Sequence, residues 1–233
     1  MFEDLSIVIP WRAGTNEWRL RSFDWILNRY QQLYRGAEII LADDGGPEFN
    51  RATFINYGVE QATREFILIA DADTISYPHF VGEGIRRIEA GAPWVIPYDD
   101  ADYYNSDEVS AEAILKLDPV TLVRPEDITW EHKLKSWSGQ VLIRREDFKS
   151  VGGFDPRFRG WGYEDNAFVT ACDTILGPHQ RVEGAWTIHI WHPAPVETTW
   201  DQPFIEQNRA LFAQYDARSG NVDSMLRFIW EGK

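Results

Sequence analysis

Short apolar runs that alternate with amphipathic segments most constrain the fold of this 233-residue chain. Residues 5–10 (LSIVIP), 37–46 (AEIILADDGG) and 65–74 (EFILIADADT) each contain an apolar run that is typical of a buried strand. Between these runs, residues 16–34 carry apolar side chains near helical spacing, and residues 49–62 are also predicted to be helical. This alternation predicts an α/β fold with a mostly parallel sheet flanked by helices.

The rest of the chain continues the pattern after one unusual stretch. Residues 99–135 are acidic, polar and interrupted by prolines, with one helical piece near 110–117, so we expect an insertion beside the site. Further strands are expected at 93–98, 140–144 and 185–190, and further helices at 78–90, from Glu146, at 163–175 and at about 204–215.

Functional-looking residues follow three of the predicted strands. Pro10 and Arg12 follow the first, Asp43 follows the second, and Asp71 and Asp73 follow the third. Because ligands bind at the carboxyl ends of strands in open α/β sheets, we expect these residues to meet in one crevice. Two carboxylates this close repel each other unless water solvates them or a cation lies between them. Their place at a strand end favours the cation over a solvated surface turn.

The pair of aspartates and two histidines indicate a metal site. Asp71 and Asp73 would share one face of an extended strand, because side chains alternate along it. Carboxylate oxygens suit Mg²⁺ or Mn²⁺, ions that commonly bridge a protein to substrate phosphates. His189 and His192 close another predicted strand, and imidazole suits Mn²⁺ better than Mg²⁺. Packing beside Trp191 is the alternative, but with Asp-x-Asp in the same chain a ligand role for at least one histidine is favoured.

The sequence RGWGYEDN, residues 159–166, combines an aromatic residue with two acids. Glycines flank Trp161, which allows a flexible loop with an exposed ring. Glu164 and Asp165 begin a predicted helix, where the helix dipole alone would favour acids. The functional interpretation is a carboxylate base beside an aromatic platform, since Trp stacks on a sugar ring while a carboxylate accepts a hydroxyl proton.

Charge and composition limit the partners and the location. A net charge of −14 argues against nucleic acid and anionic membrane surfaces as partners, so an anionic substrate needs local arginines or a metal. The single cysteine, Cys172, excludes an internal disulfide and suits a reducing compartment. Because we find neither a signal peptide nor an apolar stretch of membrane-spanning length, we expect a cytoplasmic location.

Six segments, in this order, resemble the motifs of nucleotide-sugar glycosyltransferases with the GT-A fold. They are IPWR (9–12), FNRATFINYG (49–58), DAD (71–73), WSG (137–139), GGFDPRFRGWGYED (152–165) and HIWH (189–192). The likeness is to the animal β-galactosyltransferases that use UDP-galactose and to related bacterial chain-polymerising transferases of the family 2-like group. It implies one GT-A domain over 1–233, with a nucleotide-binding half (1–98), the insertion (99–135) and an acceptor or catalytic half (136–233).

The resemblance also implies which residues bind a UDP-sugar donor. Asp43 would contact the base or ribose, and Asp71 would face the ribose or the donor sugar. Gly139 would line the sugar pocket, and Trp161 would lie on a mobile loop over it. The residues around the uridine and diphosphate would be Pro10, Arg12, Phe49 and Arg51.

For the chemistry, the resemblance implies a metal-dependent transfer that inverts the anomeric carbon. Asp73, His192 and His189 would hold Mn²⁺ or Mg²⁺. Glu164 would orient the sugars, and Asp165 would be the general base that accepts a proton from a hydroxyl of a carbohydrate or other acceptor. The reference pKa of an aspartate, about 4, would leave Asp165 ionised at neutral pH even after a modest rise.

Three other functions are compatible with parts of the sequence. A phosphatase of the haloacid-dehalogenase kind would use Asp71 as a phosphorylated nucleophile, although such enzymes normally place that motif on the first strand. A nucleotidyltransferase that makes sugar nucleotides would need a glycine-rich loop after the first strand, where this chain has one glycine. A non-catalytic sugar-binding module on the same fold is the third. The sequence does not identify the sugar or the acceptor.

Overall fold

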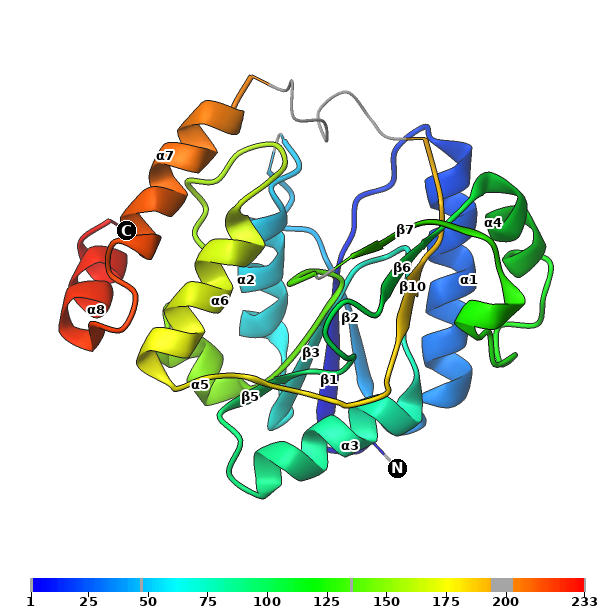
Figure 1. The fold of residues 1–233 in the computed structure, drawn as a ribbon, viewed down its shortest axis with the longest axis horizontal. Helices are drawn as coiled ribbons and strands as arrows, with labels where there is room; N and C mark the ends of the chain where they lie inside the picture. The colour runs from blue at the N-terminus through cyan, green and yellow to red at the C-terminus, as the bar shows by residue number, and fades with distance from the viewer. Residues whose placement is uncertain (1, 47, 135, 194–202, 233) are drawn as a thin grey trace.

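The computed structural model describes residues 2–46, 48–134, 136–193 and 203–232. A six-stranded sheet lies at its centre with helices around it (Figure 1). β8 runs antiparallel to both of its neighbours, whereas the other strand pairs of this sheet are parallel. The α/β class and the mostly parallel sheet are therefore confirmed. In spatial order the strands are β2 (Glu38–Ala42), β1 (Leu5–Pro10), β3 (Phe66–Ala70), β8 (Gln140–Arg144), β5 (Trp94–Ile96) and β9 (Gln180–Arg181).

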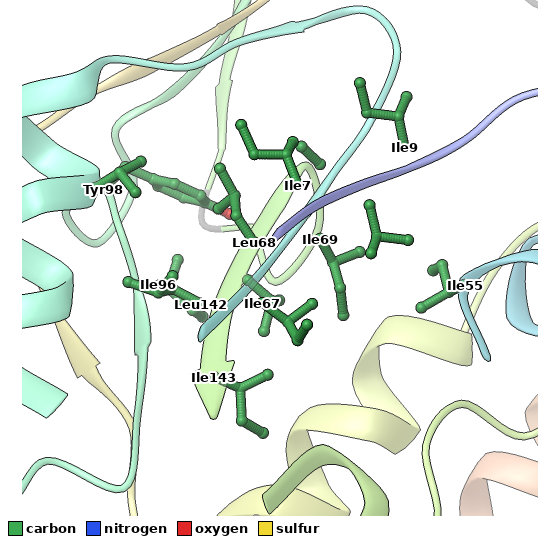
Figure 2. Close-up of a cluster of buried hydrophobic side chains, with 14 of the residues drawn as sticks. Ile7, Ile9, Ile55, Ile67, Leu68, Ile69, Ile96, Tyr98, Leu142 and Ile143 are labelled. Carbon is green, nitrogen blue, oxygen red and sulfur yellow. The ribbon is translucent and has the colours of Figure 1, made fainter. Parts of the chain in front are cut away.

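The middle strands form the core of the molecule. Every residue of β1 and β3 is buried, as expected for apolar runs covered on both faces of a sheet. Figure 2 shows how side chains of β1, β3 and β8 gather with Ile55 of the neighbouring helix. Burial of each such side chain contributes about 1.5–3 kcal/mol, so this cluster fixes the strand ends that follow it.

Three helices follow the first strands, close to the predicted ranges. They are α1 (Glu17–Leu33), α2 (Arg51–Gln61) and α3 (Pro78–Glu89). Asn16 and Asn50 cap the first two, because their side chains accept hydrogen bonds from backbone amides of the first turn. Because each of these helices follows directly after a strand in the chain, a strand end and a helix N-terminus lie at the same edge of the sheet.

A second sheet lies beside the first and corrects one prediction. It contains β4 (Thr74–Ile75), β10 (Thr187–His189), β6 (Tyr103–Ser106) and β7 (Trp130–Leu134), in that order. The stretch 99–135 thus supplies two strands besides α4 (Glu108–Ile114) and a short 3₁₀ turn (Pro125–Asp127), where only one helical piece was expected. Its polar strands lack an apolar run, and they form because β10 offers a pairing partner from far along the chain.

The C-terminal part is helical. α5 (Arg145–Ser150), α6 (Glu164–Ile175) and α7 (Ile205–Asp216) agree with the predicted ranges, whereas α8 (Val222–Glu231) was not predicted. Among the described residues, no helix combines the length and apolarity needed to span a membrane. The last three helices meet at the left of Figure 1 around a smaller apolar cluster of Phe158, Ala167, Ala171, Tyr215, Met225 and Ile229.

Candidate active site

An arginine joins two carboxylates at the end of the central strand. Arg51 is the first residue of α2, Asp71 directly follows β3, and Asp165 lies in the first turn of α6. Nε and Nη2 of Arg51 donate to Oδ1 of Asp71 at 3.0 and 2.8 Å, and Nη1 donates to Oδ1 of Asp165 at 2.8 Å. The side chains of Arg51 and Asp165 are each only 16% exposed. Residues far apart in sequence therefore form one compact cluster at the end of β3.

Burial and repulsion change the protonation of this cluster. Burial raises the pKa of Asp165 to about 7, since the attraction of Arg51 is opposed by the nearby charges of Glu164 and Asp71. Burial also raises the pKa of Glu164, which is 9% exposed. This rise in the pKa of Asp165 is larger than the modest rise that we considered from the sequence. A carboxylate with a pKa near neutrality is well matched to accepting a proton.

The second cluster contains Asp73 and the two predicted histidines. Nε2 of His192 lies 3.2 Å from Oδ2 of Asp73, and Nε2 of His189 lies 3.7 Å from Oδ1. One ligand atom from each of the three residues falls within 4.8 Å of the others. The backbone holds the arrangement, because the amide of Ile190 donates to the carbonyl of Asp73 at 2.8 Å.

The electrostatics of these three residues suit a cation. Burial opposes the charge of Asp73, but the two imidazoles hold its pKa well below the ordinary value. Burial lowers the pKa of His189, which favours the neutral imidazole that binds metals. For His192 the effect of burial is outweighed by its hydrogen bond with Asp73, so its pKa is raised. One carboxylate and two imidazoles form a ligand set that fits Mn²⁺.

The two aspartates of the DAD motif do not share a face, contrary to our expectation. β3 ends at Ala70, and the following residues form a turn in which the amide of Thr74 lies 3.4 Å from the carbonyl of Asp71. Asp71 therefore faces Arg51, while Asp73 faces the histidines. The side-chain alternation that we assumed holds only for extended backbone, and the strand stops before the first aspartate.

Three of the predicted nucleotide-binding residues, Pro10, Arg12 and Asp43, lie at the ends of β1 and β2, and Phe49 lies between β2 and α2. Nε of Arg12 donates to Oδ2 of Asp43 at 2.8 Å, and this hydrogen bond lowers the pKa of Asp43 to about 2. Pro10 is the last residue of β1 and pairs with the last residue of β2. Phe49 is 44% exposed, and its ring lies 4.9 Å from that of Phe54. These residues thus border the edge of the sheet that carries Asp71.

The structure places Gly139 and Trp161 on two segments close to the carboxylates. The carbonyl of Gly139 accepts a hydrogen bond from the amide of Asp71 at 2.9 Å. Gly139 has φ of 83°, and a Cβ there would lie 2.7 Å from the ring of Tyr103, so another residue would not fit. Trp161 is half-buried, and the Asn208 amide of α7 donates to its carbonyl at 3.3 Å.

Two asparagines near the site were not singled out by the sequence reasoning. The side-chain amide of Asn50 donates to the backbone carbonyls of Pro156 and Phe158 at 3.1 and 3.0 Å. The side-chain amide of Asn56 donates to the backbone carbonyl of Phe154 at 2.8 Å, and its Oδ1 accepts from the backbone amide of Phe154 at 2.9 Å. They attach α2 to the loop that leads to Asp165. Their recurrence within the segment FNRATFINYG was the only indication in the sequence.

The arrangement of strands and helices has a known counterpart. Residues 1–349 of S. aureus TarS, solved with UDP-GlcNAc, match over 97% of this chain and 70% of that chain, with a TM-score of 0.61 and 11% identity. The catalytic domain of Drosophila β1,4-galactosyltransferase 7, solved with xylobiose, matches over 88% of this chain and 79% of that chain, with a TM-score of 0.51 and 17% identity. Mycobacterium tuberculosis glucosyl-3-phosphoglycerate synthase, solved with phosphoglyceric acid, matches over 94% and 80%, with a TM-score of 0.50 and 16% identity. The chain has the GT-A fold of glycosyltransferases.

A comparison with protein families gives a more specific likeness. Residues 129–184 match the family model described as the N-terminal domain of galactosyltransferase. This segment contains Gly139, Trp161, Glu164 and Asp165. A search of the curated proteins gave no match. The expected resemblance to GT-A glycosyltransferases is confirmed in the fold and, over this segment, in the sequence, and it supports the predicted enzyme class.

Proposed function

We propose that this protein is a metal-dependent, inverting glycosyltransferase that moves a sugar from a UDP-sugar to an acceptor hydroxyl. One observation carries the proposal: the three residues that follow β3 contribute one aspartate to each of the two clusters described above. Asp71 belongs to the cluster that contains the base candidate Asp165, and Asp73 belongs to the cation-binding candidate. A reaction that transfers a sugar from a diphosphate to a hydroxyl can use both functions side by side.

The metal would be held by Asp73, His189 and His192. A divalent ion at this position supplies neutralisation of the charge that develops on a diphosphate leaving group. Three protein ligands leave coordination positions for phosphate oxygens. Local positive charge matters in this chain, because its net charge of −14 otherwise repels an anionic donor.

The donor would lie along the ends of β1, β2 and β3. Phe49 offers an exposed ring for the flat uracil base, and Pro10, Arg12 and Asp43 border the same edge of the sheet. In this proposal the sugar lies near Asp71 and Gly139, with Trp161 over it. The wide coverage of a structure solved with UDP-GlcNAc supports a sugar nucleotide as the class of donor.

Asp165 would remove the proton from the acceptor hydroxyl as that oxygen attacks the anomeric carbon. The bond between the anomeric carbon and the diphosphate oxygen breaks at the same time, and the bonding electrons leave with UDP. Attack from the face opposite the diphosphate inverts the carbon, so an α-linked UDP-sugar gives a β-linked product. Arg51 positions Asp165 through the hydrogen bond at 2.8 Å, and Glu164 would orient the sugars.

The test is a screen of UDP-, GDP- and dTDP-sugars for hydrolysis and thermal shift, with Mn²⁺ or with EDTA. We expect UDP-sugars to be cleaved and to stabilise the protein only when Mn²⁺ is present. A thermal shift with GDP and none with UDP would show that the donor is wrong. An α-linked product in the NMR spectrum would remove Asp165 from the mechanism.

The same screen distinguishes the other functions. Binding of a sugar nucleotide without any turnover in the presence of acceptors would indicate a non-catalytic module. Covalent labelling of Asp71 by phosphate would indicate a phosphatase. A phosphatase of this kind would not use the grouping of Asp73 with two histidines, and a non-catalytic module would not need Asp165 beside it, which is why we favour glycosyl transfer.

A further inference from the structure

A pocket between α6 and α7 has no role in the mechanism proposed above. Its volume is about 260 Å³, enough for a small ring, and it lies where the two helices run side by side (Figure 1). Asn166 and Thr170 of α6 form one wall, and Phe212 and Asp216 of α7 form the other. Trp137, from the segment before β8, closes one side.

Two residues that line the pocket are close in sequence to residues of the candidate active site. Asn166 directly follows Asp165 in the first turns of α6. Trp137 lies two residues before Gly139, whose carbonyl accepts the hydrogen bond from the Asp71 amide at 2.9 Å. The pocket therefore begins at the first turn of α6, which also carries the base candidate Asp165.

The chemistry of the lining indicates a neutral sugar. Within the part of the chain that the structure describes, no hydrogen bond or ion pair involves the side-chain amide of Asn166 or the carboxylate of Asp216. Hydroxyl groups can donate to that carboxylate and both donate to and accept from that amide. The Trp137 ring has the Arg181 guanidinium 5.0 Å from its centre, and the Phe212 ring stacks on Tyr163 at 5.6 Å. The remaining surface of these two rings is of the kind that covers the apolar face of a sugar ring. The carboxylate of Asp216 disfavours an anion such as a nucleotide, whereas that of Asp173 is bonded to His179 at 3.1 Å.

We propose that this pocket binds the acceptor sugar unit next to the one that carries the reacting hydroxyl. The preferred acceptor would then be an oligosaccharide of two or more units. This inference rests on the proposed glycosyltransferase function and adds the length of the acceptor to it.

The experiment compares acceptors of increasing length. Transfer is measured with a UDP-sugar that the enzyme hydrolyses in Mn²⁺, using xylose, glucose and N-acetylglucosamine and the β1,4-linked dimers and trimers of each. In at least one series, kcat/KM should rise about tenfold or more from monomer to dimer, which corresponds to about 1.4 kcal/mol. Ser219→Trp, at an exposed residue on the rim, should remove this gain and leave hydrolysis of the donor unchanged.

Matched variants separate blockage of the pocket from damage to the fold. Ser150→Trp introduces the same side chain at an exposed residue of α5 and should keep the gain. Asp216→Ala should reduce the gain, whereas Asp223→Ala, on exposed α8 surface, should not. If donor hydrolysis occurs but no series depends on length, or the gain survives in Ser219→Trp, the pocket proposal is wrong and the proposed function stands. If no sugar nucleotide is cleaved, the proposed function itself is overturned, and the acceptor subsite with it.

Discussion

Arg51 holds two carboxylates that have different predicted tasks, and the balance of charge around it would determine when Asp165 can act as the proposed base. Because only the ionised carboxylate accepts a proton, and burial raises its pKa to about 7, kcat/KM should rise as the pH increases through about 7 and then level off. Asp165→Asn should lower kcat by about 10² to 10⁴ while donor affinity is kept. Initial rates between about pH 5.5 and 8.5, with a donor-binding titration, check this. A near-normal kcat for the variant would contradict it.

His192 allows a test of the metal site against a matched residue. His192→Ala removes one of three candidate ligands and should abolish activity that depends on Mn²⁺, together with Mn²⁺ binding measured by calorimetry. His132→Ala, on the exposed side of β7, should leave both unchanged. Equal activity of the unmodified protein in EDTA and in Mn²⁺ would show that no metal is needed.

Several site residues could be predicted one by one, but their contacts could not. The spacing His189-x-x-His192 beside an Asp-x-Asp motif indicated the candidate ligands that the structure brings together. The bridge from Arg51 to Asp165 was not foreseen, because it joins residues 114 positions apart and depends on how α2 and α6 pack. No periodic pattern in a sequence reports such a contact.

At the scale of elements, Gly58 explains how closely α2 approaches the sheet. A Cβ at this position would lie 2.5 Å from Cγ1 of Val8 and 2.8 Å from Cβ of Ala42, both on rigid strands. Gly58→Ala should therefore lower the free energy of unfolding by about 1–3 kcal/mol, as overpacking does. Gly82→Ala, in α3, meets nothing within 4 Å and should raise it by about 0.5–1 kcal/mol. Urea unfolding measures both, and equal effects of the two changes would refute this explanation.

The success of element prediction followed the strength of the local pattern. β1 and β3 are continuous apolar runs, and α1 and α2 begin at capping asparagines, so their ranges were predicted closely. β6 and β7 are short and polar. β6 pairs with the strand at residues 187–189 and β7 pairs with β6, which is a property of the tertiary fold. Local propensity is overridden there by the partner that the fold provides.

At the scale of the whole molecule, one buried carboxylate attaches the C-terminal helices to the rest. Asp155 is 6% exposed and accepts from the Tyr215 hydroxyl of α7 at 2.8 Å and from Nη2 of Arg157 at 2.7 Å. Tyr215→Phe leaves this buried charge with one donor fewer and should lower the free energy of unfolding by about 1.5–3 kcal/mol. Tyr57→Phe, at a ring that is 39% exposed, should change it by less than about 0.5 kcal/mol. Similar unfolding midpoints for both variants would contradict the role given to Asp155.

The position of Asp73 has one more consequence, which concerns the lifetime of the folded chain. Its turn leaves the six-stranded sheet after β3 and enters the four-stranded sheet at β4, while His189 belongs to β10 of that second sheet. An ion held by these side chains would act as a removable cross-link between the turn that follows β3 and the end of β10. By mass action, an ion at one hundred times its dissociation constant stabilises the native state by about 2.7 kcal/mol. Withdrawal of the ion would then expose the chain to proteolysis as well as stop its chemistry, so the divalent ion supply would regulate how long the protein persists.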